Sequence, residues 1–417
     1  MKIDIPYGEE LTSIEIDGDY DILLPKKIKV KDEETTILNA LNNPIGRESF
    51  DEFIEKIKHL LVIVNDATRP TPTPKILEIL SSKLLDHPDV KFIVATGSHK
   101  PPTEKGYRFI FGENYEVFKE NIIVHDSRRN DMIYKGISSR GTKILVNPIL
   151  YEYKNIFIIG SVEPHYFAGY TGGRKSFIPG VSAFKTIELN HSFALNREAK
   201  SLALKGNPVH EDMIEIADKI MEGLNVFSLQ TVVTNDRKIY AATAGELHAS
   251  FEKAVPYANE VFSVPFREKG DIVITVAPPP LDINLYQSQK ALDNGKLALK
   301  ENGILILVSK CRNGAGDDTF LKLLSKASKP DEVYEIIKKG YKLGYHKAAK
   351  IAEIATWADI WAVTSLNEDT VRKALMKPYK DIQKAVDDAI NIIRKRGGKP
   401  RIIVLPQGSI TVPRGGN

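Results

Sequence analysis

Short apolar runs recur along the first part of the chain and alternate with helical segments. The runs are Leu60–Asn65, Val90–Thr96, Asn121–Asp126, Thr142–Asn147 and Asn155–Ser161. Runs that are apolar on both faces are typical of strands buried in a parallel sheet. Between the first two, "TPKILEILSSKLLDH" has apolar residues at helical spacing, which predicts a crossover helix. This order predicts an open α/β sheet.

The same rhythm restarts after residue 265. Apolar runs begin at Asp271, Gly303, Asp359 and Arg401, and helical stretches such as "PDEVYEIIKKGYKLGY" lie between them. A chain of 417 residues also exceeds the usual size of one domain. We therefore expect two α/β domains, 1–265 and 266–417, each with a mainly parallel sheet flanked by helices. Whether the last strand packs back on the first domain stays open.

Polar loops follow the predicted strands. They are "NDATRPTPTP", "GSHKPPT", "EPHYFAGYTGGRKS" and "PPPLDINLYQSQK". Ligand sites of open parallel sheets lie at the carboxyl ends of the strands. We therefore expect one active site, in a cleft between the two domains, to collect these loops.

Composition excludes several classes of protein. With 42% apolar and 27% charged residues the chain is typical of a soluble globular protein, and a net charge of +4 does not suggest a nucleic-acid binder. A single cysteine excludes a disulfide framework and a cysteine-cluster metal site. Neither a signal peptide nor an apolar run of membrane-spanning length is evident, so we expect a cytoplasmic protein without a membrane partner.

The segment "EPHYFAGYTGGRKSFIPG" raises the alternative of a phosphate-loop NTPase-like enzyme. That loop needs the pattern G-x-x-x-x-G-K-[ST], in which backbone N–H groups wrap a phosphate. Gly169, Lys175 and Ser176 match, but Arg174 occupies the second glycine position. The pattern therefore disfavours the NTPase. The pair Gly172–Gly173 is expected to let the backbone approach a bound ligand.

Other loop residues are candidates for chemistry, although each taken alone is more often structural. The loop "DATRPTP" supplies Asp66 and Arg69, and the helix start that follows, with the hydroxyls of Thr71 and Thr73, is a potential anion site. Further along the chain, Gln287 and Lys290 would share one helical face. Two histidines, His99 and His165, also lie in loops after strand ends, and His191 in "ELNHSF" is a third candidate.

Taken together, these segments resemble the nickel-pincer lactate racemase family of 2-hydroxy-acid racemases and epimerases. The shared patterns are "D-x-T-R-P-x-P", "A-T-G-x-H-[KR]-P-x-T", "H-[YF]-F-A-G-[YF]-x-G-G-R-K-S-x-x-P-G", "K-T-I-x-x-N-H" and "D-x-N-x-Y-Q-x-x-K". They run through most of the chain. Their combination and fixed spacing are highly specific.

The resemblance implies a cofactor and a reaction. The cofactor is a nickel pincer nucleotide, a pyridinium mononucleotide with two sulfur-bearing arms, attached covalently through Lys175 and made by dedicated synthesis enzymes. His191 is implied as the nickel ligand from the protein, and His99 and His165 as the acid–base pair. Hydride would leave C2 of the 2-hydroxy acid for the cofactor and return to the opposite face. Histidine suits the proton transfers near neutral pH.

The remaining roles follow in the same way. Arg69 and Lys290 are the expected holders of the substrate carboxylate. Asp66 and Gln287 would orient these groups and the cofactor. Further cofactor contacts are expected from Thr71, Thr73, Gly172, Gly173 and Tyr286. The domain 1–265 would then carry the tether and the catalytic histidines, and the domain 266–417 would complete the substrate pocket.

One position departs from the lactate enzyme of the family. An ungapped comparison of "YHKAAKIAEIA" puts His346 where that enzyme has a tryptophan against the substrate. Imidazole is smaller and more polar than indole, which favours a substrate larger or more polar than lactate. A non-catalytic protein that binds a 2-hydroxy acid or a nucleotide on the same scaffold remains an alternative, which the retained His99, His165, Lys175 and His191 disfavour.

Overall fold

The computed structural model describes residues 2–415 and divides the chain into two compact units. One unit spans Lys27–Val261, and the other joins the segment up to Lys26 with the chain from Phe262 onward. The expected division at residue 265 therefore differs for the first 26 residues. These join the C-terminal unit because β3 (Asp19–Ile22) pairs in parallel with β19 (Arg401–Leu405), which adds a strand to that sheet.

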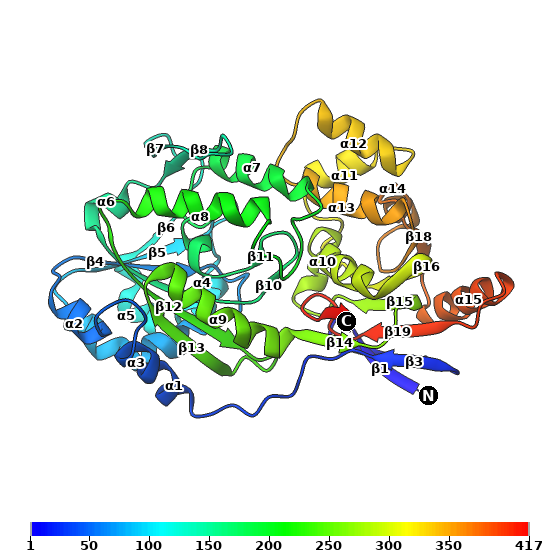
Figure 1. Cartoon of the computed structure of the whole chain (residues 1–417), viewed down its shortest axis with the longest axis horizontal. Coiled ribbons are helices and arrows are strands. Elements are labelled where there is room, and N and C mark those ends of the chain that lie inside the picture. The colour runs from blue at the N-terminus through cyan, green and yellow to red at the C-terminus, as the bar shows by residue number, and fades with distance from the viewer. Residues whose placement is uncertain (1, 416–417) are drawn as a thin grey trace. The chain divides into compact units, whose positions relative to one another are not determined.

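The Lys27–Val261 unit is built on a six-stranded sheet of order β13-β12-β9-β4-β5-β6 (Figure 1). All neighbours are parallel except β12 and β13. The strands are β4 (Leu60–Asn65), β5 (Val90–Ala95), β6 (Ile122–Val124), β9 (Asn155–Ser161), β12 (Asn225–Val233) and β13 (Ile239–Gly245). The run "LLVIV" of β4 is fully buried, as the continuous apolar pattern predicts for a central parallel strand.

Helices flank this sheet and enclose an aromatic core. The helices are α1 (Glu33–Asn42), α2 (Phe50–Glu55), α3 (Thr73–Leu85), α4 (Glu104–Phe111), α5 (Asn114–Phe118), α6 (Ile149–Tyr153), α7 (Phe184–Ser192), α8 (Pro208–Met221) and α9 (Leu247–Phe262). Phe50 of α2 packs on Phe157 of β9 and Phe227 of β12, with ring centroids 4.7 and 5.4 Å apart. Ser49 begins α2 with a capping box to Glu52.

The segment Thr142–Asn147 does not join the parallel sheet, so that prediction is wrong. It forms β8 (Lys143–Val146), which pairs antiparallel with β7 (Ile133–Ile137). Its burial alternates along the strand, which suits a hairpin with one covered face rather than a central strand. The turn is held by the buried Asp212, which accepts from Ser138 Oγ at 2.5 Å and Thr142 Oγ1 at 2.9 Å.

The second unit has an all-parallel six-stranded sheet of order β18-β17-β16-β15-β19-β3. The strands not yet given are β1 (Lys2–Tyr7), β2 (Glu10–Glu15), β14 (Ser263–Phe266), β15 (Gly270–Val276), β16 (Leu299–Val308), β17 (Asp359–Val363), β18 (Lys377–Tyr379) and β20 (Val412–Gly415). The last strand, β20, pairs with β14 of its own unit.

In the described part of this second unit there are six α-helices. They are α10 (Leu285–Gly295), α11 (Asp318–Leu324), α12 (Pro330–Lys338), α13 (Tyr345–Ala355), α14 (Glu368–Lys373) and α15 (Ile382–Lys395). The helical pattern of "PDEVYEIIKKGYKLGY" is interrupted after Lys338, where Gly340 and Gly344 adopt positive φ and separate α12 from α13. Within residues 2–415, none of the helices combines the length and apolar character that crossing a bilayer requires.

Candidate active site

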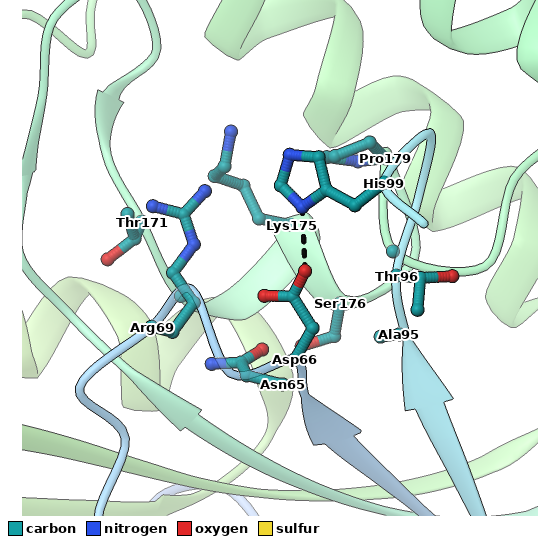
Figure 2. A pocket seen from close by; sticks show the side chains of 12 residues that line it. Asn65, Asp66, Arg69, Ala95, Thr96, His99, Thr171, Lys175, Ser176 and Pro179 are labelled. Atoms are coloured by element: carbon teal, nitrogen blue, oxygen red, sulfur yellow. Dashed lines mark hydrogen bonds and ion pairs between the residues drawn. The ribbon is translucent and has the colours of Figure 1, made fainter. Parts of the chain in front are cut away.

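Polar side chains that follow β4 and β5 meet in one pocket of the Lys27–Val261 unit. The pocket encloses about 430 Å³, part of it open to solvent. Its lining is Asn65, Asp66, Arg69, Ala95, Thr96, His99, Thr171, Gly172, Lys175, Ser176, Pro179 and Gly180. Figure 2 shows the ends of Arg69, Lys175 and His99 extending away from the strand ends toward the same side. The sheet edge thus brings together five of the candidate residues, because adjacent parallel strands end side by side: Asp66, Arg69, His99, Gly172 and Lys175.

Asp66 and His99 form a hydrogen-bonded pair at the centre of this pocket. The His99 ring donates from Nδ1 to Asp66 Oδ2 at 2.6 Å, and Asp66 Oδ1 accepts from Thr68 N and Oγ1 at 3.2 and 2.6 Å. Burial by itself raises the pKa of the Asp66 carboxyl, but the bonds and charge of His99, with Thr68 and Arg69, bring that pKa below its usual value. With the proton on Nδ1, the neutral His99 ring keeps the lone pair on Nε2.

The loop that carries Lys175 is organised by a buried arginine. Arg174 is fully buried and donates to the carbonyl oxygens of Ala168 at 2.8 Å, Tyr170 at 3.0 Å and Gly172 at 3.3 Å. Its guanidinium carbon lies 4.4 Å from the Phe251 ring centroid, and burial lowers the pKa of Arg174 to about 9. Arg174, which occupies the second glycine position of the phosphate-loop pattern, therefore holds the backbone of this loop in place.

The backbone here also differs from a phosphate loop. Gly173–Ser176 forms a single 3-10 turn after the hairpin of β10 (Pro164–His165) and β11 (Gly169–Tyr170), and the next α-helix, α7, begins only at Phe184. A phosphate loop uses the N-terminus of a helix that starts at its lysine. The NTPase-like alternative therefore loses its structural basis.

Gly172 and Gly173 serve the packing of the loop itself. Both have positive φ, and a Cβ at Gly172 would come within 2.6 Å of Gln230 Oε1. A Cβ at Gly173 would come within 2.8 Å of Phe251 Cβ. The glycines were expected to admit a ligand close to the backbone, but the space beside them is filled by the protein. Only Gly172 also lines the pocket.

The buried ring of Phe167 connects three of the candidate residues. Its centroid lies 4.5 Å from that of His165 and 5.0 Å from that of His191. The ammonium nitrogen of Lys175 lies 5.6 Å from the same centroid. The acid–base candidate, the metal-ligand candidate and the tether candidate thus surround one aromatic side chain. Sequence reasoning did not single out Phe167, although it stands in the same motif as His165.

His165 has a different hydrogen-bond environment from His99. It is buried, and its Nδ1 accepts from the backbone N–H of Ala168 at 3.3 Å. That contact puts the ring proton of neutral His165 on Nε2. The two candidate histidines therefore carry their protons on different ring nitrogens, which loop position alone could not reveal.

Thr71 and Thr73, which were also expected to contact the cofactor, do not line the pocket. Thr71 is buried, accepts from Asn65 Nδ2 at 2.7 Å and bonds Ser161 Oγ at 2.8 Å, while Ser161 Oγ donates to Glu163. Thr73 is buried in the first turn of α3. The Thr71 hydroxyl thus ties the ends of β4 and β9 together. The helix start was expected to offer its hydroxyls to an anion, but the Thr71 hydroxyl is hydrogen-bonded to Asn65 and Ser161 instead.

The remaining candidates lie in the second unit. Tyr286, Gln287 and Lys290 are on α10, where Asn284 caps the helix by accepting from Gln287 N at 2.9 Å. His346 lies in the first turn of α13, is 2% exposed and has Tyr341 Oη at 2.7 Å from its Nδ1.

Lys347 is a further candidate that sequence reasoning missed. It is 3% exposed, donates to the Tyr286 carbonyl oxygen at 2.5 Å and lies 4.2 Å from the centroid of the Tyr286 ring. Burial, and then the nearby Lys290 charge, hold the pKa of Lys347 well below its usual value. Its only sequence signal is adjacency to His346. The structure thus places two lysines near Tyr286, where the sequence indicated one.

Comparisons with known proteins agree with the resemblance seen in the motifs. The family model described as lactate racemase N-terminal domain matches residues 7–203, and that of the lactate racemase C-terminal domain matches residues 266–412. Lactate racemase of Thermoanaerobacterium thermosaccharolyticum is 31% identical, with 99% of each chain covered. Lactate racemase of Lactiplantibacillus plantarum is 29% identical, with 98% of each chain covered.

Solved structures give the same result. The lactate racemase apoprotein from T. thermosaccharolyticum superposes with a TM-score of 0.90 at 31% identity, covering 99% of this chain and 100% of that one. A Thermotoga maritima protein of 17% identity, with a TM-score of 0.72 over 93% of this chain and 100% of that one, shares the fold alone. Because identity above 30% extends over nearly the whole length of both sequences, the chain belongs to the lactate racemase family.

Proposed function

We propose that the protein is a racemase or epimerase of a 2-hydroxy acid that works with a nickel pincer nucleotide attached to Lys175. The racemase relatives support an isomerase, and the observation that carries the finer assignment is the pocket where the Asp66–His99 pair faces Lys175. The residues of this pocket suit an anionic ligand, because Arg69 and Lys175 extend to one side of it. A non-catalytic binder would need no oriented base.

The donor groups of the chain fit the cofactor. Within residues 2–415 no cluster of three or more His, Cys, Asp or Glu could hold a metal ion, so a nickel ion would need most of its ligands from a cofactor. Sulfur and imidazole ligands suit Ni(II). His191 would supply the imidazole and Lys175 the amine for the covalent link, and both lie against Phe167. The chemistry that the bound group would supply is reversible acceptance of hydride from C2 of the substrate.

His99 is the side chain best prepared to take the hydroxyl proton of the substrate. Asp66 holds the proton on Nδ1, so that Nε2 can accept another, and the carboxylate then stabilises the imidazolium. Such a base contributes about 10²- to 10⁴-fold to the rate. We assign His165 to proton transfer on the opposite enantiomer, because mirror-image substrates present their hydroxyls from different directions.

Arg69 is proposed to bind the substrate carboxylate through its planar guanidinium, since it extends from the wall of the pocket that His99 and Lys175 also line. In the second unit, Lys290 and Gln287 are proposed for the substrate and Tyr286 for the cofactor. After burial, the positive charge of Lys290 is the next cause that lowers the pKa of Lys347. Two amines close together support an anion-binding role for this part of α10. His346 is proposed to contact the substrate side group and to favour an acid larger or more polar than lactate.

The tether gives the first test. Protein co-produced with the cofactor-making enzymes should carry the adduct mass and interconvert the enantiomers of a 2-hydroxy acid, followed by chiral chromatography. Lys175→Ala should lose both the adduct and the activity while the far-ultraviolet circular dichroism stays unchanged. Lys100→Ala is the matched control, since Lys100 is an exposed lysine directly after His99. A Lys175→Ala protein that keeps the adduct mass and racemises substrate would contradict the proposal.

A further inference from the structure

A buried amide stands next to the candidate nickel ligand. Asn190 is fully buried on α7 and donates from Nδ2 to the Val209 carbonyl oxygen at 3.2 Å and to Asp212 Oδ2 at 2.8 Å. Its Oδ1 lies 3.3 Å from Nδ1 of His191. The side chain therefore links a buried carboxylate of α8 to the imidazole.

The orientation of this amide follows from its partners. A backbone carbonyl can only accept, so the Asn190 atom that faces Val209 O must be the NH₂ group. The other end, which faces His191, is then the carbonyl oxygen, which also can only accept. His191 Nδ1 must therefore carry its hydrogen, and the lone pair of the neutral ring lies on Nε2.

We propose that Asn190 is a positioning residue that holds His191 in the Nδ1–H tautomer, so that Nε2 is the atom offered to nickel, with Asp212 as the anchor of the amide. That the metal is nickel rests on the proposed function. The tautomer of His191 follows from the hydrogen bonds alone. Metal-binding histidines commonly donate their second ring nitrogen to an oxygen acceptor, which fixes the ring and raises its basicity. Here the acceptor is the neighbouring amide.

Asp212 is suited to this anchoring because its other bonds fix it in place. It accepts from Ser138 Oγ and Thr142 Oγ1 at the turn of the β7–β8 hairpin, and Ser138 Oγ in turn accepts from Thr142 N at 3.1 Å. Rotating the Asn190 amide would turn its oxygen toward Asp212 and Val209 and leave buried groups unpaired, at a cost of roughly 1–3 kcal/mol for each. The hairpin that departs from the expected parallel sheet thus has a use at the site.

The test is nitrogen-15 NMR of the histidine rings in the apoprotein, at a pH where His191 is neutral. The His191 signals are assigned by their absence in His191→Ala. Wild-type protein should show the pyrrole-type shift on Nδ1, and an Nε2–H ring would overturn the proposal. Asn190→Leu, of similar size but without an acceptor, should shift His191 toward the Nε2–H form, and an unchanged Nδ1–H ring would overturn the proposal as well.

A pair of variants separates orientation from loss of stability. The exchange Asn190→Asp with Asp212→Asn keeps an acceptor toward His191 and a donor–acceptor contact between the two positions, and it removes the donor to the Val209 carbonyl oxygen. A folded exchange variant should therefore show the Nδ1–H tautomer. Ser138→Ala removes another bond of Asp212 and should leave the tautomer unchanged. A folded exchange variant that fails to restore the tautomer, or a Ser138→Ala protein that behaves like Asn190→Leu, would refute the role of the amide.

The loaded enzyme supplies the second readout. Nickel release to a chelator should be about 10- to 100-fold faster in Asn190→Leu than in Ser138→Ala, as for other residues that orient metal-binding histidines. Equal release rates would refute the link to the metal. If wild-type protein never takes up the cofactor, the proposed function fails while the tautomer measurement on apoprotein still stands.

Discussion

Replacing Asp66 by asparagine should remove the proposed base function of His99 while keeping the shape of the site. Asp66 Oδ1 accepts from the backbone N–H and the hydroxyl of Thr68, so the oxygen of an asparagine would take that place. Its NH₂ group would then face His99 Nδ1, which must become an acceptor. The proton moves to Nε2, and the nitrogen that should accept the substrate proton is blocked.

The expected loss can be worked out from these contacts. The opposite amide orientation would set NH₂ against the N–H of the exposed residue Thr68 and lose that hydrogen bond, at roughly 0.5–1.5 kcal/mol. At 1.4 kcal/mol per tenfold, the competent ring would be present in about 10–30% of the molecules. Loss of the carboxylate charge beside the imidazolium adds to this, and the analogous change in a serine protease costs about 10⁴-fold. We expect kcat to fall by about 10²- to 10⁴-fold.

The assay is initial racemisation rates from each pure enantiomer, with cofactor loading checked by intact mass. Nitrogen-15 NMR of apoprotein should show the His99 proton on Nδ1 in wild type and on Nε2 in Asp66→Asn. Thr68→Val is the matched control, because it removes one bond to Asp66 Oδ1 and leaves the bond to His99. A rate for Asp66→Asn within about threefold of wild type, with equal loading, would refute the reasoning.

Three other substitutions test separate parts of the structure. Arg174→Met leaves three loop carbonyls without their donor and should lower the free energy of unfolding by about 3 kcal/mol or more in denaturant titration, with reduced Lys175 adduct by mass. Burial lowers the pKa of His125 from 6.5 to about 4, so as the pH falls the unfolded chain binds a proton before the folded protein does. The free energy of unfolding should therefore decrease by about 3 kcal/mol between pH 6.5 and pH 4. His125→Gln should flatten this pH dependence in unfolding experiments. His346→Trp should shift kcat/KM across a panel of 2-hydroxy acids toward lactate, because the indole fills space and removes a polar partner.

Eight of the twelve strands in the two six-stranded sheets were predicted, because their physical cause is local, whereas β3, β12, β13 and β18 were not. A strand buried on both faces must be apolar throughout, and Leu60–Asn65 and Asn155–Ser161 have that pattern and form adjacent central strands. The α/β fold class predicted from them is confirmed by the likeness to the lactate racemase apoprotein. The polar loops could be found for the same reason, since they follow those strands.

Pairing between distant segments was not predictable in this way. Nothing in "DYDI" indicates that β3 adds to the edge of a sheet formed some 380 residues later, where Arg401 binds Asp19 at 2.6 Å. The run Thr142–Asn147 has the composition of a buried strand, but its partner is the preceding hairpin strand. Composition indicates that a segment is a strand, and the partner is set by contacts that the segment does not encode.

The histidines of the candidate site also combine a feature that the sequence reveals with one that only the structure reveals. Sequence position identifies His99, His165 and His191 as candidates, but their chemistry depends on which ring nitrogen holds the proton. That is decided by single atoms of other residues: a carboxylate oxygen of Asp66, the N–H of Ala168 and the amide oxygen of Asn190. Because an acceptor and a donor impose opposite tautomers on a ring, His99 and His191 both keep the lone pair on Nε2, as the proposed base and metal ligand require, whereas neutral His165 carries its proton there. Replacing the acceptor beside His99 or His191, rather than removing the ring, is therefore the sharper way to test these two proposed roles.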